Sequence, residues 1–384
     1  MKIFKTTVFT IFIIFLLVSI SFFVKEFTGK EIKLAGDKNN QKEEKETKKE
    51  YKLSMFMVGD ALYHSAVYGD GKQADGTYNY DKHLEYIKPI VSKYDLVYYN
   101  QESILGGTKL GLSSYPLFNS PQEVGDAFVK AGFNMVSLAN NHTLDKGERG
   151  VISSNDYWKT KKGVVTAGSY NTAEDKDASH IHEKNNIKYA FLSYTTLTNG
   201  LKAPVGKEHY VNVYDKEKVK ADVDAVREQV DVVMVAMHWG EEYIHNPNAS
   251  QKEIAKYLSE IGVDIVIGSH PHVVQPIERI GDTVVIYSLG NFLSSQRETN
   301  KRVGLMATLN IVKTVENGET TVAINDVAGD LMYTYFNSNL KNFKAIPFHK
   351  LTNEYLPGHE AIKTKYEAFI NQNDDTIAVG VLEN

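Results

Sequence analysis

Six short apolar runs, most of them followed by polar side chains, constrain the fold of this chain more than any other feature. The runs cover residues 53–58, 96–99, 135–139, 232–237, 265–267 and 284–287. Each has the length of a buried β-strand, and stretches with helix signals separate some of them. This strand–helix–strand alternation predicts an α/β protein in which helices pack on the faces of sheets.

Two helices have clear start and stop signals. Ser120 and Ser250 each stand three residues before a glutamate, the pattern of a capping box, and a proline follows the first serine at the expected first helical position. Gly132 and Gly262 supply the expected ends. Both helices should therefore begin directly after these serines.

The chain beyond residue 296 has a different pattern. Strand-like runs flank Asn317-Gly318, which is the strongest two-residue hairpin signal. We expect residues 297–384 to add antiparallel strands and late helices that complete or flank the domain formed by residues 53–296.

Residues able to bind metals or transfer protons gather directly after the predicted strands. They are Asp60; Asn100 and Glu102; Asn140, Asn141 and His142, with Asp145 close behind; His238; and His270 with His272. Ligands of open α/β sheets collect at the carboxyl ends of the strands, so five such groups are expected to converge on one crevice.

The chemistry of these residues is consistent with a metal centre. Carboxylate, amide and imidazole groups without sulfur suit Mn²⁺, Fe²⁺ or Zn²⁺. Two acids and three imidazoles exceed the needs of one catalytic ion, whereas two ions about 3.5–4 Å apart with a bridging carboxylate would use them all. We therefore expect two divalent ions.

Composition excludes several other classes of protein. The chain has no cysteine, which excludes disulfide scaffolds, thiolate zinc sites, cysteine nucleophiles and a lipoprotein-type anchor. Residues 1–52 hold 11 Lys/Arg and 7 Asp/Glu, so the remaining residues carry a formal charge of about −9. Because affinity for nucleic acid comes from clustered Lys and Arg, no nucleic-acid partner is expected.

The amino terminus contains an uncharged apolar run at residues 6–24, preceded by a short stub with Lys2 and Lys5. A helix of this length spans about 30 Å, the thickness of a bilayer core. The preceding lysines place residues 1–5 in the cytoplasm and the body outside, as a single-pass signal anchor of the cell membrane. A cleaved signal peptide, with Ser19 and Ser21 before the cut, is the alternative.

Residues 25–52 are rich in charges of both signs and poor in apolar side chains. Such a segment cannot bury a core, and we expect a disordered tether. Its basic excess also allows contact with anionic lipid head groups, although a plain spacer is the simpler interpretation.

Six segments resemble the CapA family of capsule and poly-γ-glutamate biosynthesis proteins, within the metallo-dependent, calcineurin-like phosphoesterase superfamily. They are VGDALYH, YNQES, SLANNHTLDKGERG, VAMHWGEEY, IVIGSHPHVVQPIE and IYSLGNF. The resemblance covers residues 53–295, and the six segments follow one another in the same order as in the family. It implies a four-layer αββα sandwich with the metals at the loop ends of its sheets.

The resemblance also implies roles for individual residues. Asp60, Glu102 and His272 would bind one metal, with Glu102 bridging to the second, and Asn141, His238 and His270 would complete the second site. His142 would protonate a leaving group or hold an oxyanion, oriented by Asp145. Asn291 is a candidate substrate contact.

Two departures from the superfamily pattern leave the reaction open. The position two residues after Asp60, usually His, is Leu62, and the nearest imidazole is His64, a candidate metal or substrate contact. The second motif is Asn-x-Glu, whereas the superfamily pattern begins with Asp.

The resemblance implies a role in poly-γ-glutamate production beside membrane-bound synthase subunits. Three functions stay open: a metal-dependent hydrolase of a phosphoester or of polyglutamate, a non-catalytic accessory that binds the anionic polymer through metal, and a metal-free scaffold.

Overall fold

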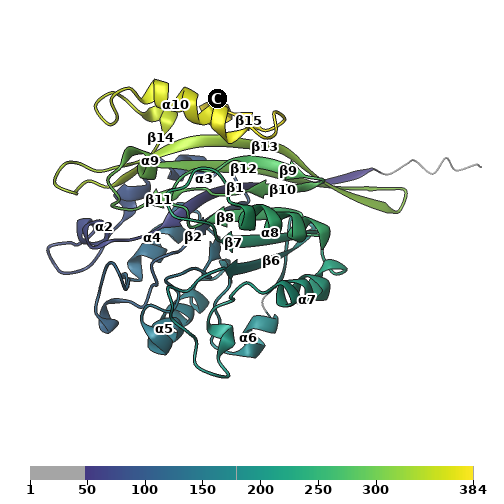
Figure 1. Cartoon of the computed structure of the whole chain (residues 1–384), viewed down its shortest axis with the longest axis horizontal. Coiled ribbons are helices and arrows are strands. Elements are labelled where there is room, and N and C mark those ends of the chain that lie inside the picture. The colour runs from purple at the N-terminus through teal and green to yellow at the C-terminus, as the bar shows by residue number, and fades with distance from the viewer. Residues whose placement is uncertain (1–47, 179, 384) are drawn as a thin grey trace, which may run out of the picture. The chain divides into compact units, whose positions relative to one another are not determined.

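The computed structural model describes residues 48–178 and 180–383, which form an α/β protein with two mixed β-sheets (Figure 1). The first sheet has the strand order β14-β13-β12-β1-β2-β3-β4, with β11 beside β1 and β15 beside β13. Its strands are β1 (Lys49–Ala61), β2 (Leu96–Asn100), β3 (Met135–Ser137), β4 (Val165–Ala167), β11 (Asn291–Leu293), β12 (Val303–Glu316), β13 (Glu319–Tyr335), β14 (Lys344–Pro347) and β15 (Ala378–Val379).

The second sheet has the order β5-β6-β7-β8-β10-β9. Its strands are β5 (Ile181–Lys184), β6 (Ile187–Thr195), β7 (Val232–His238), β8 (Ile265–Ser269), β9 (Ile277–Ile280) and β10 (Thr283–Ile286). In each sheet the central strands are parallel, β1 to β4 in the first and β6, β7, β8 and β10 in the second. Antiparallel strands form one side of the first sheet, β12 to β14, and both edges of the second, β5 and β9.

Helices connect these strands. The α-helices are α2 (Ser65–Asp70), α3 (Lys88–Val91), α4 (Glu123–Ala131), α5 (Gly147–Lys159), α6 (Ala173–Ala178), α7 (Lys216–Arg227), α8 (Ala249–Glu260), α9 (Thr299–Arg302) and α10 (His359–Ile370). Short 3-10 segments are η1 (Asp81–Leu84), η2 (Thr108–Leu110), η3 (Glu208–Tyr210), η4 (Phe348–Lys350) and η5 (Val381–Glu383).

Strands β2, β3, β7, β8 and β10 are buried along their whole length, which explains their continuous apolar runs. Side chains alternate across a strand: Met55 and Met57 of β1 face the core between the sheets, whereas Phe56 and Val58 face the core under α4 and α5. The outer face of the second sheet packs on α7 and α8 through a third cluster that includes Trp239. The layers therefore run helix, sheet, sheet, helix. Helix α10 packs on β13, at the top of Figure 1.

The carboxyl ends of the parallel strands of both sheets meet at one place. Asn100 Nδ2, at the end of β2, lies 3.4 Å from His238 Nδ1, at the end of β7. The β1–β2 register shifts between Met57 and Asp60, an irregularity of the kind often found beside functional sites. The polar residues after the strands therefore share one buried region.

The predicted strands are all present, with ends displaced by a few residues. Both helix starts were placed wrongly. Helix α4 begins at Glu123 with Gln122 at its N-cap, because the Ser120 hydroxyl instead bonds the Ser103 hydroxyl at 3.0 Å. Helix α8 begins at Ala249, and its capping box is formed by Asn248 and Gln251, two residues before the expected position.

The predicted hairpin and helix ends are confirmed. Strands β12 and β13 are joined by Asn317 and Gly318 at φ 53° and 86°, the left-handed pair that a tight two-residue turn requires. Gly132, at φ 120°, caps α4, and Gly262, at φ 90°, follows α8. Strands β12 to β14, from the carboxyl-terminal part, join the same sheet as β1.

The proposed signal anchor at residues 6–24 and the predicted tether up to residue 47 lie outside the described residues. The end of the predicted tether was placed wrongly, because residues 49–52 form the start of β1 and pair with β12. Within residues 48–178 and 180–383, the structure has no helix that is both long and apolar enough to cross a bilayer.

Candidate metal centre

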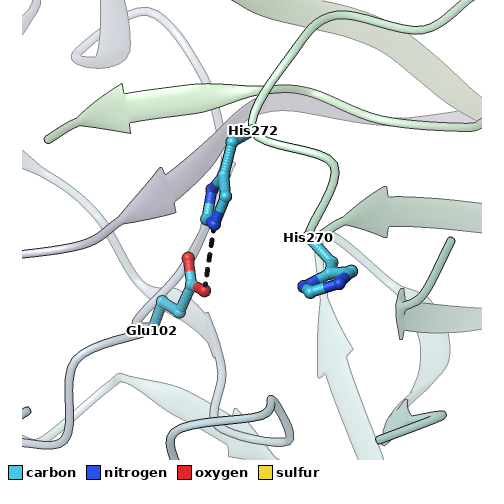
Figure 2. Close-up of side chains that lie close together, drawn as sticks. All are labelled: Glu102, His270 and His272. Atoms are coloured by element: carbon cyan, nitrogen blue, oxygen red, sulfur yellow. Dashed lines mark ion pairs between the residues drawn. The ribbon is translucent and has the colours of Figure 1, made fainter. Parts of the chain in front are cut away.

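Six predicted ligands lie together in the buried region where the strands end. Asp60 is in β1, Glu102 follows β2, Asn141 follows β3, His238 ends β7, and His270 and His272 follow β8. All six side chains belong to buried residues. Figure 2 shows Glu102 pointing at His272, with His270 facing the same space from the side.

Glu102 lies at the middle of this cluster. Its Oε1 atom is 3.7 Å from His238 Nε2 and also 3.7 Å from His272 Nε2. Ligand atoms of Glu102, His270 and His272 all lie within 4.8 Å of one another, close enough to share one ion. The carboxylate is therefore situated between two groups of ligands.

The first group contains Asp60 and His272. His272 Nδ1 lies 3.3 Å from Asp60 Oδ2 and 3.0 Å from Asn291 Oδ1. Asp60 also accepts hydrogen bonds from Asn100 Nδ2 at 2.8 Å and from the backbone N–H of His270 at 3.2 Å. These contacts fix the carboxylate and one ring orientation.

The second group contains Asn141, His238 and His270. His238 Nε2 lies 3.0 Å from Asn141 Oδ1 and 3.1 Å from His270 Nδ1, while His238 Nδ1 lies 3.0 Å from Ser269 Oγ. Two imidazole nitrogens and an amide oxygen therefore lie about a hydrogen-bond length apart. A cation placed among these three atoms could bind the lone pairs of all of them.

Both oxygens of the Glu102 carboxylate are buried without a hydrogen-bond partner among the described residues. Leaving a buried carboxylate unpaired is costly, so the group either takes up a proton or binds a cation. Burial raises the pKa of Glu102 well above its usual value, although His272 opposes this effect. A divalent cation would satisfy the oxygens, so the residues fit a metal.

The imidazoles have unequal proton affinities for physical reasons. Burial lowers the pKa of His270 to about 4, assisted by the neighbouring His272. Burial and the two adjacent histidines hold the pKa of His238 well below its ordinary value. For His272 burial acts in the same direction, but Glu102 and Asp60 outweigh it and raise the pKa to about 9. The second group is therefore neutral at pH 7, as metal ligation by histidine requires.

The backbone of the His-Pro-His segment is strained. His270 and His272 have φ of 96° and 57°, in the left-handed region that bulky residues rarely adopt. Such strain persists where the surroundings enforce it and is frequent at functional sites. Here it directs both imidazoles toward Glu102.

His142 and Asp145 form a pair beside the cluster. His142 Nδ1 lies 2.7 Å from Asp145 Oδ2, which also accepts the backbone N–H of Phe118 at 2.5 Å. The ring of Phe118 lies between the rings of His142 and His64, at centroid distances of 4.6 and 5.1 Å. Asp145 thus fixes one nitrogen of His142 and leaves Nε2 available.

His64 and Leu62 differ from the six clustered residues. His64 Nδ1 lies 3.0 Å from the backbone oxygen of Leu62, and the structure gives it no direct contact with the six. Leu62 is 3% exposed and apolar. Asn291, by contrast, lies inside the region through its contact with His272.

Three residues at the centre were not assigned a role from the sequence. Asn100 holds Asp60, Ser269 contacts His238, and Asn141 Nδ2 donates to Asn199 Oδ1 at 3.4 Å. Asn100 stood at a predicted strand end, which was a usable signal. Asn199 stood only in an Asn-Gly turn, and nothing in the sequence placed that turn beside Asn141.

Comparisons with known proteins match the segments that build this centre. The family model described as "Bacterial capsule synthesis protein PGA_cap" covers residues 54–296. "PGA biosynthesis protein CapA" of Bacillus subtilis (strain 168) is 30% identical over 256 residues, which are 65% of this chain and 65% of that protein. "Capsule biosynthesis protein CapA" of Bacillus anthracis is 29% identical over 260 residues, 65% of this chain and 62% of that protein. The chain thus spans slightly under two thirds of the length of these relatives.

A crystal structure of TT1561 of Thermus thermophilus aligns with 71% of this chain and 98% of that chain, at 8% identity and a TM-score of 0.37. A score this low does not assign a fold. The family match instead rests on residues 54–296, which contain the complete buried cluster from Asp60 to Asn291. The chain belongs to the bacterial capsule synthesis protein family PGA_cap.

Proposed function

We propose that this protein acts in capsule or poly-γ-glutamate biosynthesis at the cell surface, through a two-metal centre of the metallophosphatase type. The observation that carries the proposal is the buried Glu102 carboxylate, which lacks a hydrogen-bond partner among the described residues and lies 3.7 Å from both His238 and His272. Asp60, Glu102 and His272 would hold one ion, and Asn141, His238 and His270 the second, with Glu102 between them.

In hydrolysis, some residues around the centre would position the ligands and another would donate a proton. Bound divalent ions supply Lewis-acid activation of water and neutralise developing negative charge. Asn100 and Asn291 keep Asp60 and His272 in place through their side-chain contacts. His142, held at Nδ1 by Asp145, would donate a proton from Nε2 to a leaving group.

Two bonds are candidates for cleavage, a phosphoester and an amide of a glutamate polymer. The ligand set suits either. A non-catalytic accessory that binds the anionic polymer through the metal is the second candidate, favoured by the buried apolar Leu62 where the superfamily pattern has a histidine.

We propose the location that the sequence suggests, with residues 6–24 as a signal anchor, a tether from residue 25 that ends where β1 begins at Lys49, and the rest of the chain outside. Membrane-bound synthase subunits would be the partners. Protease added to intact cells should then digest the body, and complete protection would contradict this orientation.

The test of the metal centre is the metal content of the full-length chain purified without chelator. About two ions per chain are expected, with loss in His238→Ala and His272→Ala and no loss in His209→Ala, a histidine control that contacts the Asn171 backbone. No stoichiometric metal in the wild type, even after Mn²⁺ or Zn²⁺ is added back, would refute the proposal.

A second variant separates catalysis from binding. His142→Ala should keep its metal and abolish polymer production in cells. If polymer output stays normal while the two ligand variants lose polymer binding, the accessory function is correct and the hydrolase is not.

A further inference from the structure

We propose that Tyr243 and Lys301 form an oxyanion-binding element at the edge of the metal centre, which receives an anionic group of the substrate. This inference rests on the proposed function, because it concerns the ligand of the same site. Neither residue was assigned a role by the sequence.

Tyr243 is held beside the centre in an unfavourable conformation. Its φ is 69°, which bulky side chains rarely adopt, and its backbone N–H donates to the oxygen of Pro271 at 2.7 Å. Pro271 separates the two clustered histidines, and the Tyr243 ring centroid lies 6.1 Å from that of His272. The side chain is nevertheless 39% exposed, so the strain is not explained by packing into a core.

Lys301 lies against the same ring. Its Nζ atom is 3.6 Å from the Tyr243 ring centroid, a close cation–π contact, and its side chain is only 16% exposed. The Lys301 backbone oxygen accepts from Asn291 Nδ2 at 2.8 Å, and Asn291 Oδ1 contacts His272. Lys301 is therefore linked to His272 in two ways, through its ammonium group on the Tyr243 ring and through its backbone oxygen on Asn291.

The charges around the centre explain why a cation is needed there. Asp60 Oδ2 lies 3.3 Å from His272 Nδ1, and Glu102 Oε1 lies 3.7 Å from His272 Nε2, so an anionic ligand that approaches His272 meets carboxylates whose charge a nearby ammonium group offsets. Lys301 has one ion-pair partner among the described residues, Glu298, at 3.3 Å and with a side chain 61% exposed. The Glu298 carboxylate is the exposed member of this pair, and ion pairs with an exposed partner are weak, so an incoming anion can replace Glu298.

The chemistry of the element defines the ligand class. An ammonium group binds a carboxylate or a phosphate as a point charge, and the Tyr243 ring offers an apolar face to the methylenes beside it. The anion would be a carboxylate of a γ-linked glutamyl chain or the phosphate of a phosphoester. Both share the same contact with Lys301.

The test measures the affinity of the full-length, manganese-loaded chain for a short γ-glutamyl oligomer and for a phosphate monoester by calorimetry. Lys301→Gln removes the charge and is expected to weaken binding of at least one ligand about tenfold, with a smaller salt dependence. Lys301→Arg keeps the charge and should stay within about threefold of the wild type. Tyr243→Asn, a residue that tolerates the left-handed backbone, should weaken binding as Lys301→Gln does.

Lys256→Gln is the matched control, because Lys256 is an exposed lysine of helix α8 paired with Glu260 at 3.7 Å. It should bind both ligands as the wild type does. Loss confined to the glutamyl oligomer identifies the carboxylate as the anion, and loss confined to the monoester identifies the phosphate.

Unchanged affinity of Lys301→Gln for both ligands would overturn the inference, as would a wild-type chain that binds neither. The manganese content of every preparation is measured in parallel, and the titrations are repeated without the metal. A wild-type chain that holds no manganese contradicts the proposed function, whereas the effect of Lys301→Gln decides the oxyanion element in either case.

Discussion

The close approach of two backbones at Gly59 positions the residue that follows it. A Cβ atom on Gly59 would lie 1.8 Å from the carbonyl oxygen of Gly290, and the N–H of Asp60 donates to that same oxygen at 2.9 Å. We expect Gly59→Ala to lower the free energy of unfolding by about 2–4 kcal/mol, because neither backbone can move without displacing a strand.

Urea denaturation of this variant beside Gly69→Ala checks the prediction. Gly69 lies in α2 with nothing within 4 Å of its Cβ position, so its alanine variant should match or slightly exceed the wild type, by less than about 1 kcal/mol. Equal stability of the two variants would contradict the close approach.

His64 gives the fold a dependence on pH. Burial lowers its pKa to about 4, and His272 and His142 act in the same direction against the hydrogen bond to Leu62. The unfolded residue has a pKa of about 6.5, so between these values the unfolded chain binds more protons and stability falls as the pH falls. The contribution is complete above pH 6.5 and is lost as the pH approaches 4.

We expect the metal-free chain to lose about 1–2 kcal/mol from this residue over that range, since the side chain is only partly buried. His64→Gln should show a shallower decline of stability with acidification, measured by urea titration at several pH values. Identical slopes for the two proteins would show that another group is responsible.

At the scale of elements, helix α8 begins at a different residue from the one that its local sequence pattern predicted. The Asn248 side chain accepts the backbone N–H of Gln251 at 2.9 Å, and the Gln251 side chain bonds back to the Asn248 backbone. This capping box begins two residues before the one expected at Ser250. The Gln251 side chain is also held by a bond from its amide nitrogen to the buried Gln275 at 2.7 Å, a contact that the local pattern at Ser250 does not contain.

Asn248→Ala should therefore lower the free energy of unfolding by about 1 kcal/mol through loss of the cap. Ser250→Ala, inside the first turn, should be neutral within about 0.5 kcal/mol. Thermal unfolding of both variants distinguishes the two positions, and a larger effect at Ser250 would favour the start expected from the sequence.

The β12–β13 hairpin shows the opposite case, in which local chemistry was sufficient. Asn317 and Gly318 tolerate the left-handed conformation that the turn requires. Glu316 pairs with Glu319 directly beside the turn, and the pairing continues along both strands from there. No distant residue has to select this turn, so the sequence predicted it correctly.

At the scale of the whole molecule, the metal centre would link the two sheets. Asp60 and Glu102 belong to the first sheet and its loops, whereas His238 and His270 belong to the second. An ion bound by both sets stabilises only the folded chain, by about 3 kcal/mol at a free concentration a hundred times the dissociation constant.

We therefore expect a chelator to lower the unfolding temperature of the metal-loaded wild type, and to leave that of His238→Ala unchanged. Differential scanning calorimetry with and without EDTA measures both. A wild-type transition that does not respond to the chelator would show that the sheets are held without metal.

The sequence by itself determined the alternation of strands and helices, because a central strand that is buried on both faces needs apolar side chains at successive positions. It also determined which residues are candidates for the centre, since polar groups placed directly after buried strands have few structural reasons to be there. The family resemblance implied how these groups divide between two ions, but only the tertiary structure shows which atoms contact one another. The contact of His238 with His270 and Asn141, the central position of Glu102 and the strained Tyr243 beside Lys301 all join segments far apart in the chain. Such contacts depend on how two sheets pack and twist against each other, and no local pattern encodes that geometry.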